Sequence, residues 1–163
     1  MLSSEAPSQQ LSFWNFDKEE LYDEIMCKVS NLTSLDFIHC NIKNLPKNLN
    51  KFTNLEILGF NEKKFDIFPL EICDITSLKK LYIRDTNIDK IPDEIKNLTN
   101  LECLHVQDNK LKSLPESISK MPNLKYIDCT NNNITHIPDS LKINPNLKIE
   151  LVDKFIRCSN SFK

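Results

Sequence analysis

The stretch from Leu101 to Asn123, LECLHVQDNKLKSLPESISKMPN, decides the fold of this 163-residue chain. It is one of five units in which leucine recurs every 23 residues, at Leu32, Leu55, Leu78, Leu101 and Leu124. Proline recurs at one later phase of every unit, at Pro46, Pro69, Pro92, Pro115 and Pro138. Self-similarity at such a period is typical of proteins built from stacked repeats, in which each unit covers the core of its neighbour.

Each unit predicts one β-strand followed by an irregular return. Positions 4 and 6 are apolar and flank an outward position 5, which is the alternation of a half-buried strand. The inward pairs are Leu35/Phe37, Leu58/Phe60, Leu81/Ile83, Leu104/Val106 and Ile127/Cys129. Proline at position 15 lacks a backbone donor, so the return segment is expected to be irregular or a short helical turn. Apolar residues at positions 18 and 21 then point back to the core.

These recurring leucines, prolines and inward apolar residues resemble those of the leucine-rich-repeat family. The chain follows the family pattern LxxLxLxxNxLxxLPxxLxxLxx over about residues 32–153. The resemblance implies an α/β fold: a right-handed solenoid with a curved parallel β-sheet on its concave face. It also implies protein recognition without chemistry of its own. The 23-residue LPxxL type is similar to intracellular Ras-scaffold and scribble-like arrays, and to arrays in bacterial effectors.

Position 9 is where this family places a ladder of asparagines, whose amides satisfy backbone groups after each strand. Asn109 and Asn132 fit this pattern, with Cys40 and Thr86 as tolerated variants. Lys63 does not fit, because a lysine cannot accept hydrogen bonds and is costly to bury unpaired. The sequence therefore predicts an irregular loop around Lys63.

The segments outside the repeats are expected to cover the two ends of the core. Residues 1–10 are expected to be a disordered tail, and residues 11–31 a helical N-terminal cap whose helix begins at Asp17. A helix that docks on a partner is the alternative for the second segment. Residues 32–146 hold the five repeats, and residues 147–163 a partial terminal repeat and C-terminal cap. A last strand with one residue deleted is expected at Leu147, Ile149 and Leu151.

Composition and charge argue against several classes of function. A net charge of −2, from 21 basic and 23 acidic residues, gives no reason to expect nucleic acid or an anionic membrane as partner. No run approaches the roughly 20 apolar residues of a membrane span, and the N-terminus lacks a secretory pattern. Six cysteines stand singly, so we expect reduced thiols and no metal site. We also expect no cofactor and no small-molecule substrate. We expect a monomer in the cytoplasm of the source cell, or of a host cell that receives it.

The candidate binding surface consists of the outward positions of the expected strands. Five strands with about four outward residues each supply about 20 positions, close to one side of a standard protein interface. Tyr82, Arg84 and Tyr126 are of the types that most often carry interface energy. The partner-binding residues predicted on this face are Asp36, Ile38, Ile57, Gly59, Lys80, Tyr82, Arg84, His105, Gln107, Tyr126 and Asp128.

Gly59 is the only glycine in the chain, and it falls in the middle of this face. Glycine is a poor strand residue unless something must approach the backbone closely. One hypothesis is a notch that accepts a partner side chain, walled by Ile38, Ile57 and Tyr82. The alternative is that Tyr82 leans over the space.

Three side chains at outward strand positions have the order found in the active site of a cysteine hydrolase. Cys103 and His105 lie two apart on one expected strand, with Asp128 beside His105 on the next, the order that a cysteine hydrolase requires. An open sheet offers no water-excluding pocket and no free amides for an oxyanion, so a His105–Asp128 hydrogen bond beside a free thiol is the preferred interpretation. We expect a non-catalytic module that binds a protein. The alternatives are a targeting subunit that recruits a phosphatase or ubiquitin ligase to a substrate and, remotely, the hydrolase.

Overall fold

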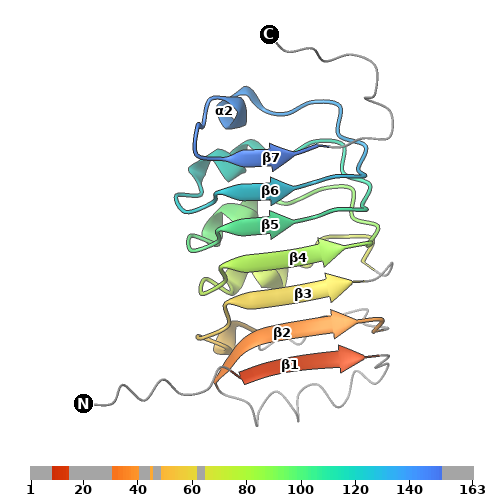
Figure 1. Cartoon of the computed structure of the whole chain (residues 1–163), viewed down its shortest axis with the longest axis vertical. Helices are drawn as coiled ribbons and strands as arrows, with labels where there is room; N and C mark the ends of the chain where they lie inside the picture. Colours follow the sequence, from red (N-terminus) through yellow and green to blue (C-terminus); the bar gives the residue numbers. More distant parts are fainter. Residues whose placement is uncertain (1–8, 15–30, 41–44, 46–48, 62–64, 152–163) are drawn as a thin grey trace, which may run out of the picture.

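The computed structural model describes residues 9–14, 31–40, 45, 49–61 and 65–151. Within these residues the strands form one seven-stranded parallel sheet, whose spatial order follows the sequence (Figure 1). The strands are β1 (Gln9–Trp14), β2 (Leu32–Ile38), β3 (Ile57–Asn61), β4 (Lys80–Arg84), β5 (Cys103–His105), β6 (Tyr126–Asp128) and β7 (Lys148–Glu150). Each strand is one step of a stack, and β2 to β7 are the steps that the sequence predicted.

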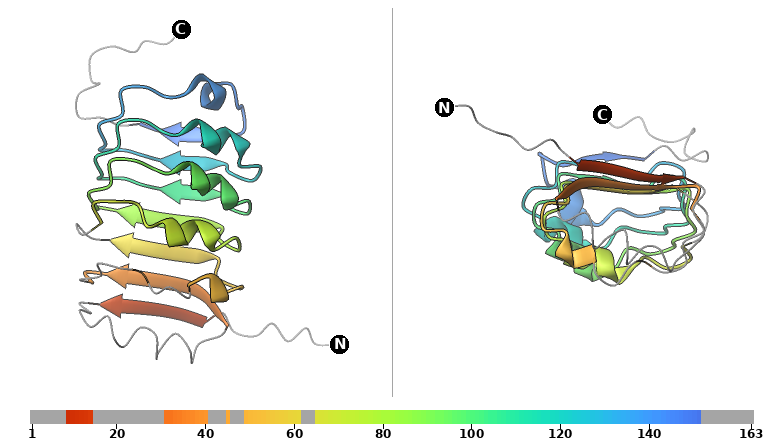
Figure 2. Two further views of the ribbon diagram at one scale, coloured as in Figure 1. Left: turned by 180° about the vertical axis from the view of Figure 1, so that it is seen from behind. Right: turned by 90° about the horizontal axis from the view of Figure 1, so that it is seen from below.

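The return segments contain short helices that form a second layer behind the sheet (Figure 2). The 3-10 helices are η1 (Leu49–Lys51), η2 (Leu70–Asp74), η3 (Asp93–Asn97) and η4 (Glu116–Lys120), and α2 (Asp139–Lys142) is α-helical. The last four begin directly after the repeat prolines Pro69, Pro92, Pro115 and Pro138. Proline suits the start of a helix because the backbone N–H it lacks would have no partner there. In the described part of the chain, no helix has the length and apolar character to cross a bilayer.

The core between the two layers is continuous and is built from the inward repeat positions. Leu58, Leu81 and Leu104 of successive strands are completely buried. Full burial of one such side chain contributes about 1.5–3 kcal/mol. At the N-terminal end of the core the rings of Phe13, Phe37 and Phe60 stack, with centroid distances of 5.4 and 5.2 Å. Stacking of equivalent side chains therefore joins each repeat to the next in the core, alongside the pairing of their strands.

The asparagines at position 9 form the ladder that the resemblance implies. Asn109 Nδ2 donates hydrogen bonds to the carbonyl oxygens of Ile83 at 2.7 Å and Val106 at 3.1 Å. Asn132 Nδ2 donates in the same way to Val106 O at 2.8 Å and Cys129 O at 3.0 Å. Each amide thus connects its own turn to the preceding repeat and satisfies backbone acceptors that lie inside the stack.

The two variants at position 9 also donate hydrogen bonds inside the stack, one to a backbone carbonyl and one to the side chain of a ladder asparagine. The Cys40 thiol donates to Phe13 O at 3.3 Å, and the Thr86 hydroxyl donates to Asn109 Oδ1. All four position-9 side chains are buried. Lys63 and its predicted irregular loop lie outside the described residues.

The N-terminal end differs from the sequence prediction. Residues 9–14, expected to divide between a disordered tail and a helical cap, form strand β1, which pairs with β2 and places Phe13 opposite Phe37. The prediction was wrong for these residues because the exposed edge of β2 offers a row of backbone donors and acceptors that a further strand satisfies. The helix expected from Asp17 falls outside the described residues.

The C-terminal end agrees with the predicted deletion. Strand β7 pairs with β6, and Ile149 lies opposite Ile127, one residue nearer in sequence than the period of 23 requires. The C-terminal cap expected after Leu151 lies outside the described residues.

A tight turn follows each of the strands β2, β4, β5 and β6 at repeat position 8. His39, Asp85, Asp108 and Asn131 occupy it with φ of 55°, 49°, 57° and 55°. This left-handed conformation is costly for most residues, and Asn, Asp and His tolerate it better than others. The polar character of position 8 therefore has a backbone cause.

Candidate partner-binding surface

The helical layer covers one side of the sheet, and we name the opposite side the open sheet face (Figures 1 and 2). The outward positions of the strands lie on this face, since the alternate positions are buried in the core. Parallel pairing puts equivalent positions side by side, so position 5 forms a row across the sheet. The row runs Asp36, Gly59, Tyr82, His105, Asp128 and Glu150. The predicted neighbours His105 and Asp128 are paired in register.

The predicted residues on either side of this row also lie on the open sheet face. Ile57, Lys80, Cys103 and Tyr126 form the adjacent row at position 3, which Lys148 continues. Ile38 and Arg84 are at position 7, and Gln107 follows the end of β5. Ile38, Ile57, Tyr82, Arg84, Gln107 and Tyr126 are each partly buried, whereas Lys80 is exposed. The structure therefore brings the predicted residues onto one surface.

Four of these side chains pack into a continuous group, which we call the aromatic strip: Arg84, Tyr82, His105 and Tyr126. The Tyr82 and His105 rings stack with centroids 4.5 Å apart and planes at 15°. The His105 and Tyr126 centroids are 5.3 Å apart with the planes tilted by 54°. The Arg84 guanidinium lies 4.8 Å above the Tyr82 ring, a cation–π arrangement. Each ring restricts its neighbour, so the strip forms one ordered group of side chains.

The surroundings of His105 favour the neutral form of its imidazole. Burial lowers the pKa of its imidazole, and the positive charge of Arg84 lowers the pKa further. Arg84 Nη2 lies 3.3 Å and Gln107 Nε2 3.4 Å from His105 Nδ1. Two donors that face Nδ1 favour the tautomer with its proton on Nε2.

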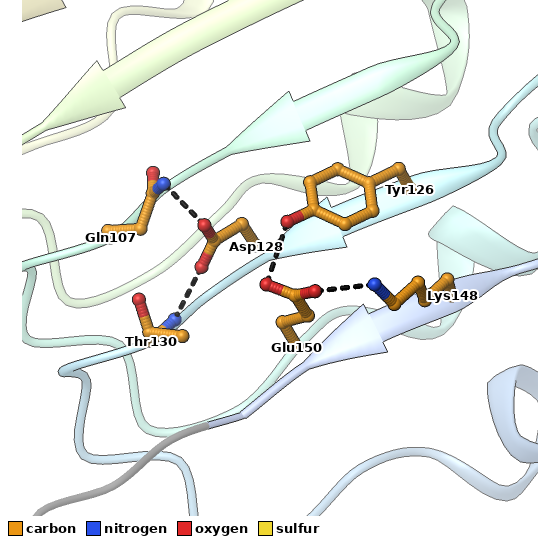
Figure 3. Close-up of polar contacts among 6 residues, drawn as sticks. All are labelled: Gln107, Tyr126, Asp128, Thr130, Lys148 and Glu150. Carbon is orange, nitrogen blue, oxygen red and sulfur yellow. Dashed lines mark hydrogen bonds and ion pairs between the residues drawn. The ribbon is translucent and has the colours of Figure 1, made fainter.

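Asp128 does not form the hydrogen bond to His105 that the sequence suggested. Its carboxylate accepts from Gln107 Nε2 at 2.5 Å and from the Thr130 backbone N–H at 3.1 Å (Figure 3). The described residues therefore do not assemble a Cys103–His105–Asp128 triad, because the carboxylate holds the turn after β6 and the amide of Gln107. Nor do they group three His, Cys, Asp or Glu side chains as a metal site requires.

Strand β7 adds a polar cluster that the sequence analysis missed. The Tyr126 hydroxyl donates to Glu150 Oε2 at 2.8 Å, and Lys148 Nζ donates to Glu150 Oε1 at 2.6 Å (Figure 3). The hydrogen bond to Glu150 raises the pKa of Tyr126 to about 12. The Lys148–Ile149–Glu150 alternation was a signal for these residues, since it places both charged side chains on the face opposite the core.

A hollow of about 230 Å³ lies at Gly59, where the sequence suggested a notch. Ile38 and Tyr82 line it as predicted, together with Asn61 and Arg84, but the expected wall residue Ile57 does not. Asp36 supplies a carboxylate directly over Gly59. Burial raises the pKa of Asp36, and the Ser34 hydroxyl, 3.5 Å from its Oδ2, offsets this in part. The hollow, which we call the Gly59 notch, thus joins a carboxylate, a guanidinium and apolar walls.

Comparison with known proteins identifies the repeat. The family model for the leucine-rich repeat region matches residues 31–148. A search of the curated proteins found no match. Among solved structures, the chain is similar to a leucine-rich-repeat protein of Leptospira interrogans, with a TM-score of 0.72 and 26% sequence identity over 88% of this chain.

Two other solved structures share the fold at lower identity. The leucine-rich-repeat domain of the type III effector XopL has a TM-score of 0.70 and 20% identity over 90% of this chain. The TLR13–ssRNA13 complex has a TM-score of 0.74 and 21% identity over 89% of this chain. The chain spans 38% of the Leptospira protein, 51% of the XopL domain and 21% of TLR13.

Proposed function

We propose, from the premise that this chain belongs to the leucine-rich-repeat family, that it is a non-catalytic module which binds a protein partner on the open sheet face. Repeats of this family generally serve protein binding. The observation that carries the proposal is the aromatic strip, in which Arg84, Tyr82, His105 and Tyr126 form one ordered group on an accessible face.

The chemistry of the aromatic strip suits an interface. Tyrosine and arginine dominate the binding energy of many interfaces, because they combine a large apolar surface with a polar end. Their mutual stacking reduces the conformational entropy that an interface must otherwise give up on binding. The strip therefore supports recognition of a protein surface in preference to a small substrate.

The Gly59 notch suggests which chemical group the partner inserts. Asp36 offers an acceptor and Arg84 a donor, and both line the same hollow as Ile38 and Tyr82. A charged partner group would meet one like charge there, whereas an amide can donate to Asp36 and accept from Arg84. We therefore propose that an Asn or Gln side chain, or an exposed peptide group, of the partner enters the notch.

The cellular role compatible with this surface is an adaptor or a targeting subunit. An adaptor needs one binding face, whereas a subunit that brings a phosphatase or ubiquitin ligase to a substrate needs two. The six cysteines of the chain stand singly in the sequence, which is usual in proteins of reducing compartments. We propose a cytoplasmic monomer.

Affinity capture with matched variants tests the proposal. The full chain is the bait, and Tyr82→Ala/Arg84→Ala/Tyr126→Ala is compared with wild type. The control, Lys96→Ala/Lys112→Ala/Lys120→Ala, removes as many long side chains from exposed positions of the return segments. Circular dichroism first establishes that all three proteins are folded.

The captured protein is then purified, and its affinity for the three baits is measured. Loss of one hot-spot residue costs about 2 kcal/mol or more, a factor of about 30 in affinity. Because the strip variant removes three candidate residues, we expect it to bind at least about 100-fold more weakly. The control should bind as tightly as wild type. Equal affinity of the strip variant and wild type would place the interface elsewhere.

A further inference from the structure

A second surface, which is aliphatic where the strip is aromatic, lies on the return segments of two neighbouring repeats. Ile67 is 80% exposed and Leu70 is 54% exposed, although both are large aliphatic residues. They line one groove of about 420 Å³, whose other wall comes from the segment between Asp89 and Glu94. Leu70 begins η2, so the groove belongs to the helical layer and not to the open sheet face.

The repeat itself shows that these two side chains are exceptional. Ile67 is at position 13, where the other units have Asn44, Lys90, Ser113 and His136. Leu70 is at position 16, where the others have Lys47, Asp93, Glu116 and Asp139. One repeat alone replaces both polar residues by aliphatic ones, and it does so at two positions that share a groove.

The core does not require this replacement. Phe65 and Phe68, on either side of Ile67, are buried and supply the apolar contacts of this segment. The Phe65 ring meets Phe60 edge-on, with centroids 5.4 Å apart. Ile67 instead points away from the core. An exposed apolar groove with a polar rim is a common mark of a binding site.

The groove carries an excess of negative charge, because Asp89, Asp93 and Glu94 line it against a single cation, Lys90. The same return segments also contain Asp66, Glu71 and Asp74 and no further cation between residues 65 and 74. Within the described residues none of these carboxylates is held in an ion pair. Burial raises the pKa of the neighbouring Cys73 thiol to about 12, and the charges of Glu94 and Asp74 contribute to the increase. The negative field is thus available to a partner.

We infer that this groove is a second docking site, whose occupant is a peptide segment with an aliphatic or aromatic side chain flanked by lysine or arginine. The apolar side chain fills the space between Ile67 and Leu70, and its basic neighbours face Asp93 and Glu94. The site goes beyond the proposed function, because it gives the module a second partner surface. Two surfaces are what a targeting subunit needs.

Selection from a random peptide library displayed on phage tests the site directly. The full wild-type chain is the bait, and binders are counter-selected on Ile67→Ser/Leu70→Ser, which leaves the open sheet face intact. We expect the surviving peptides to share an apolar residue with adjacent Lys or Arg. Survivors without basic residues, or no survivors, would overturn the inference.

A synthetic peptide from the selection is then titrated by fluorescence anisotropy against matched variants. Ile67→Ser/Leu70→Ser should lower the affinity at least about tenfold, since burial of one aliphatic side chain is worth about 1.5–3 kcal/mol. Asp93→Asn/Glu94→Gln should also weaken binding and reduce its dependence on salt. The control Ile143→Ser removes an equally exposed aliphatic side chain, 81% exposed, outside the groove, and should change nothing.

Two results would contradict the inference even if peptides are selected. One is equal affinity for wild type and Ile67→Ser/Leu70→Ser. The other is a dimer of the wild-type chain, seen by sedimentation and abolished by the same double variant, which would make a second copy of the chain the occupant. The aromatic-strip variant should bind the peptide normally, so failure of this site and failure of the proposed function are distinguishable.

Discussion

The carboxylate of Asp36 on β2 lies directly over Gly59 on β3, and a β-carbon at Gly59 would collide with Asp36 Oδ1. The Asp36 β-carbon is 3.8 Å from that position, an ordinary contact. It is therefore the carboxylate, and not the strand backbone, that excludes a side chain at position 59. The unique glycine and the half-buried aspartate form one structural unit.

A double-mutant cycle on this pair should show strong coupling. In the wild-type chain the new side chain of Gly59→Ala must displace the Asp36 carboxylate. In an Asp36→Ala background the carboxylate is gone, and the β-carbon that remains at position 36 is far enough away to cause no collision. Alanine is better than glycine within a strand by roughly 0.5–1 kcal/mol, so Gly59→Ala should stabilise the Asp36→Ala protein. We expect a coupling free energy of about 1 kcal/mol from urea unfolding. Additive effects would show that the two residues are independent.

Asp36→Asn should stabilise the protein at neutral pH. Burial raises the pKa of the folded-state carboxyl above its ordinary value of 3.8. A carboxyl whose pKa is raised by folding stabilises the protein below its unfolded-state pKa. This stability is lost as the pH rises through the folded-state pKa. The advantage of the variant in thermal midpoint should therefore vanish below about pH 4 and be largest near pH 7. Asp66→Asn, at an exposed carboxyl, is the control.

His105 should make the wild-type protein less stable as the medium becomes mildly acidic. Burial and Arg84 lower its folded-state pKa below 6.5, so the unfolded chain takes up the proton first. The stability that neutral His105 contributes is therefore present above the unfolded-state pKa and is lost as the pH falls below that pKa. Urea unfolding at about pH 8 and about pH 5.5 should show a smaller loss for His105→Gln than for wild type. His136→Gln, at an exposed histidine, should behave as wild type.

Asn109→Ala should be among the most destabilising single substitutions in the chain. Its amide donates to Ile83 O, Val106 O and Gln107 O, and its Oδ1 accepts from Thr86. Loss of the side chain removes the side-chain donor to Ile83 O and the acceptor of the Thr86 hydroxyl, each at a cost of about 1–3 kcal/mol, so we expect a total of about 3 kcal/mol. Val106 O and Gln107 O keep hydrogen bonds from Asn132 Nδ2 and the Asp85 N–H. Thr86→Ala removes a single hydrogen bond and should cost less. A comparable loss for both variants in urea unfolding would contradict the ladder.

The repeat made much of the fold predictable. A period of 23 fixes which residues share a position, and period-two alternation fixes which of them point inward, so the repeat positions of Leu58, Leu81 and Leu104 were enough to assign these residues to the core. Strand β1 was not predicted because it lies outside the regular repeats, although Leu11 and Phe13 show the same alternation of apolar residues. The period alone also gives no reason for the polar residues at position 8, which the left-handed turn observed in the structure accounts for.

The sequence by itself determined which side chains share the open sheet face and which rows they form, because parallel pairing at a constant period leaves little freedom in register. Only the tertiary structure decided how those side chains meet: Asp128 bonds Gln107 and not His105, and Asp36 lies over Gly59. Such choices depend on rotamers and on competition among neighbouring donors and acceptors. Differences of about 1 kcal/mol between alternative hydrogen bonds select one arrangement, and sequence spacing contains no measure of them.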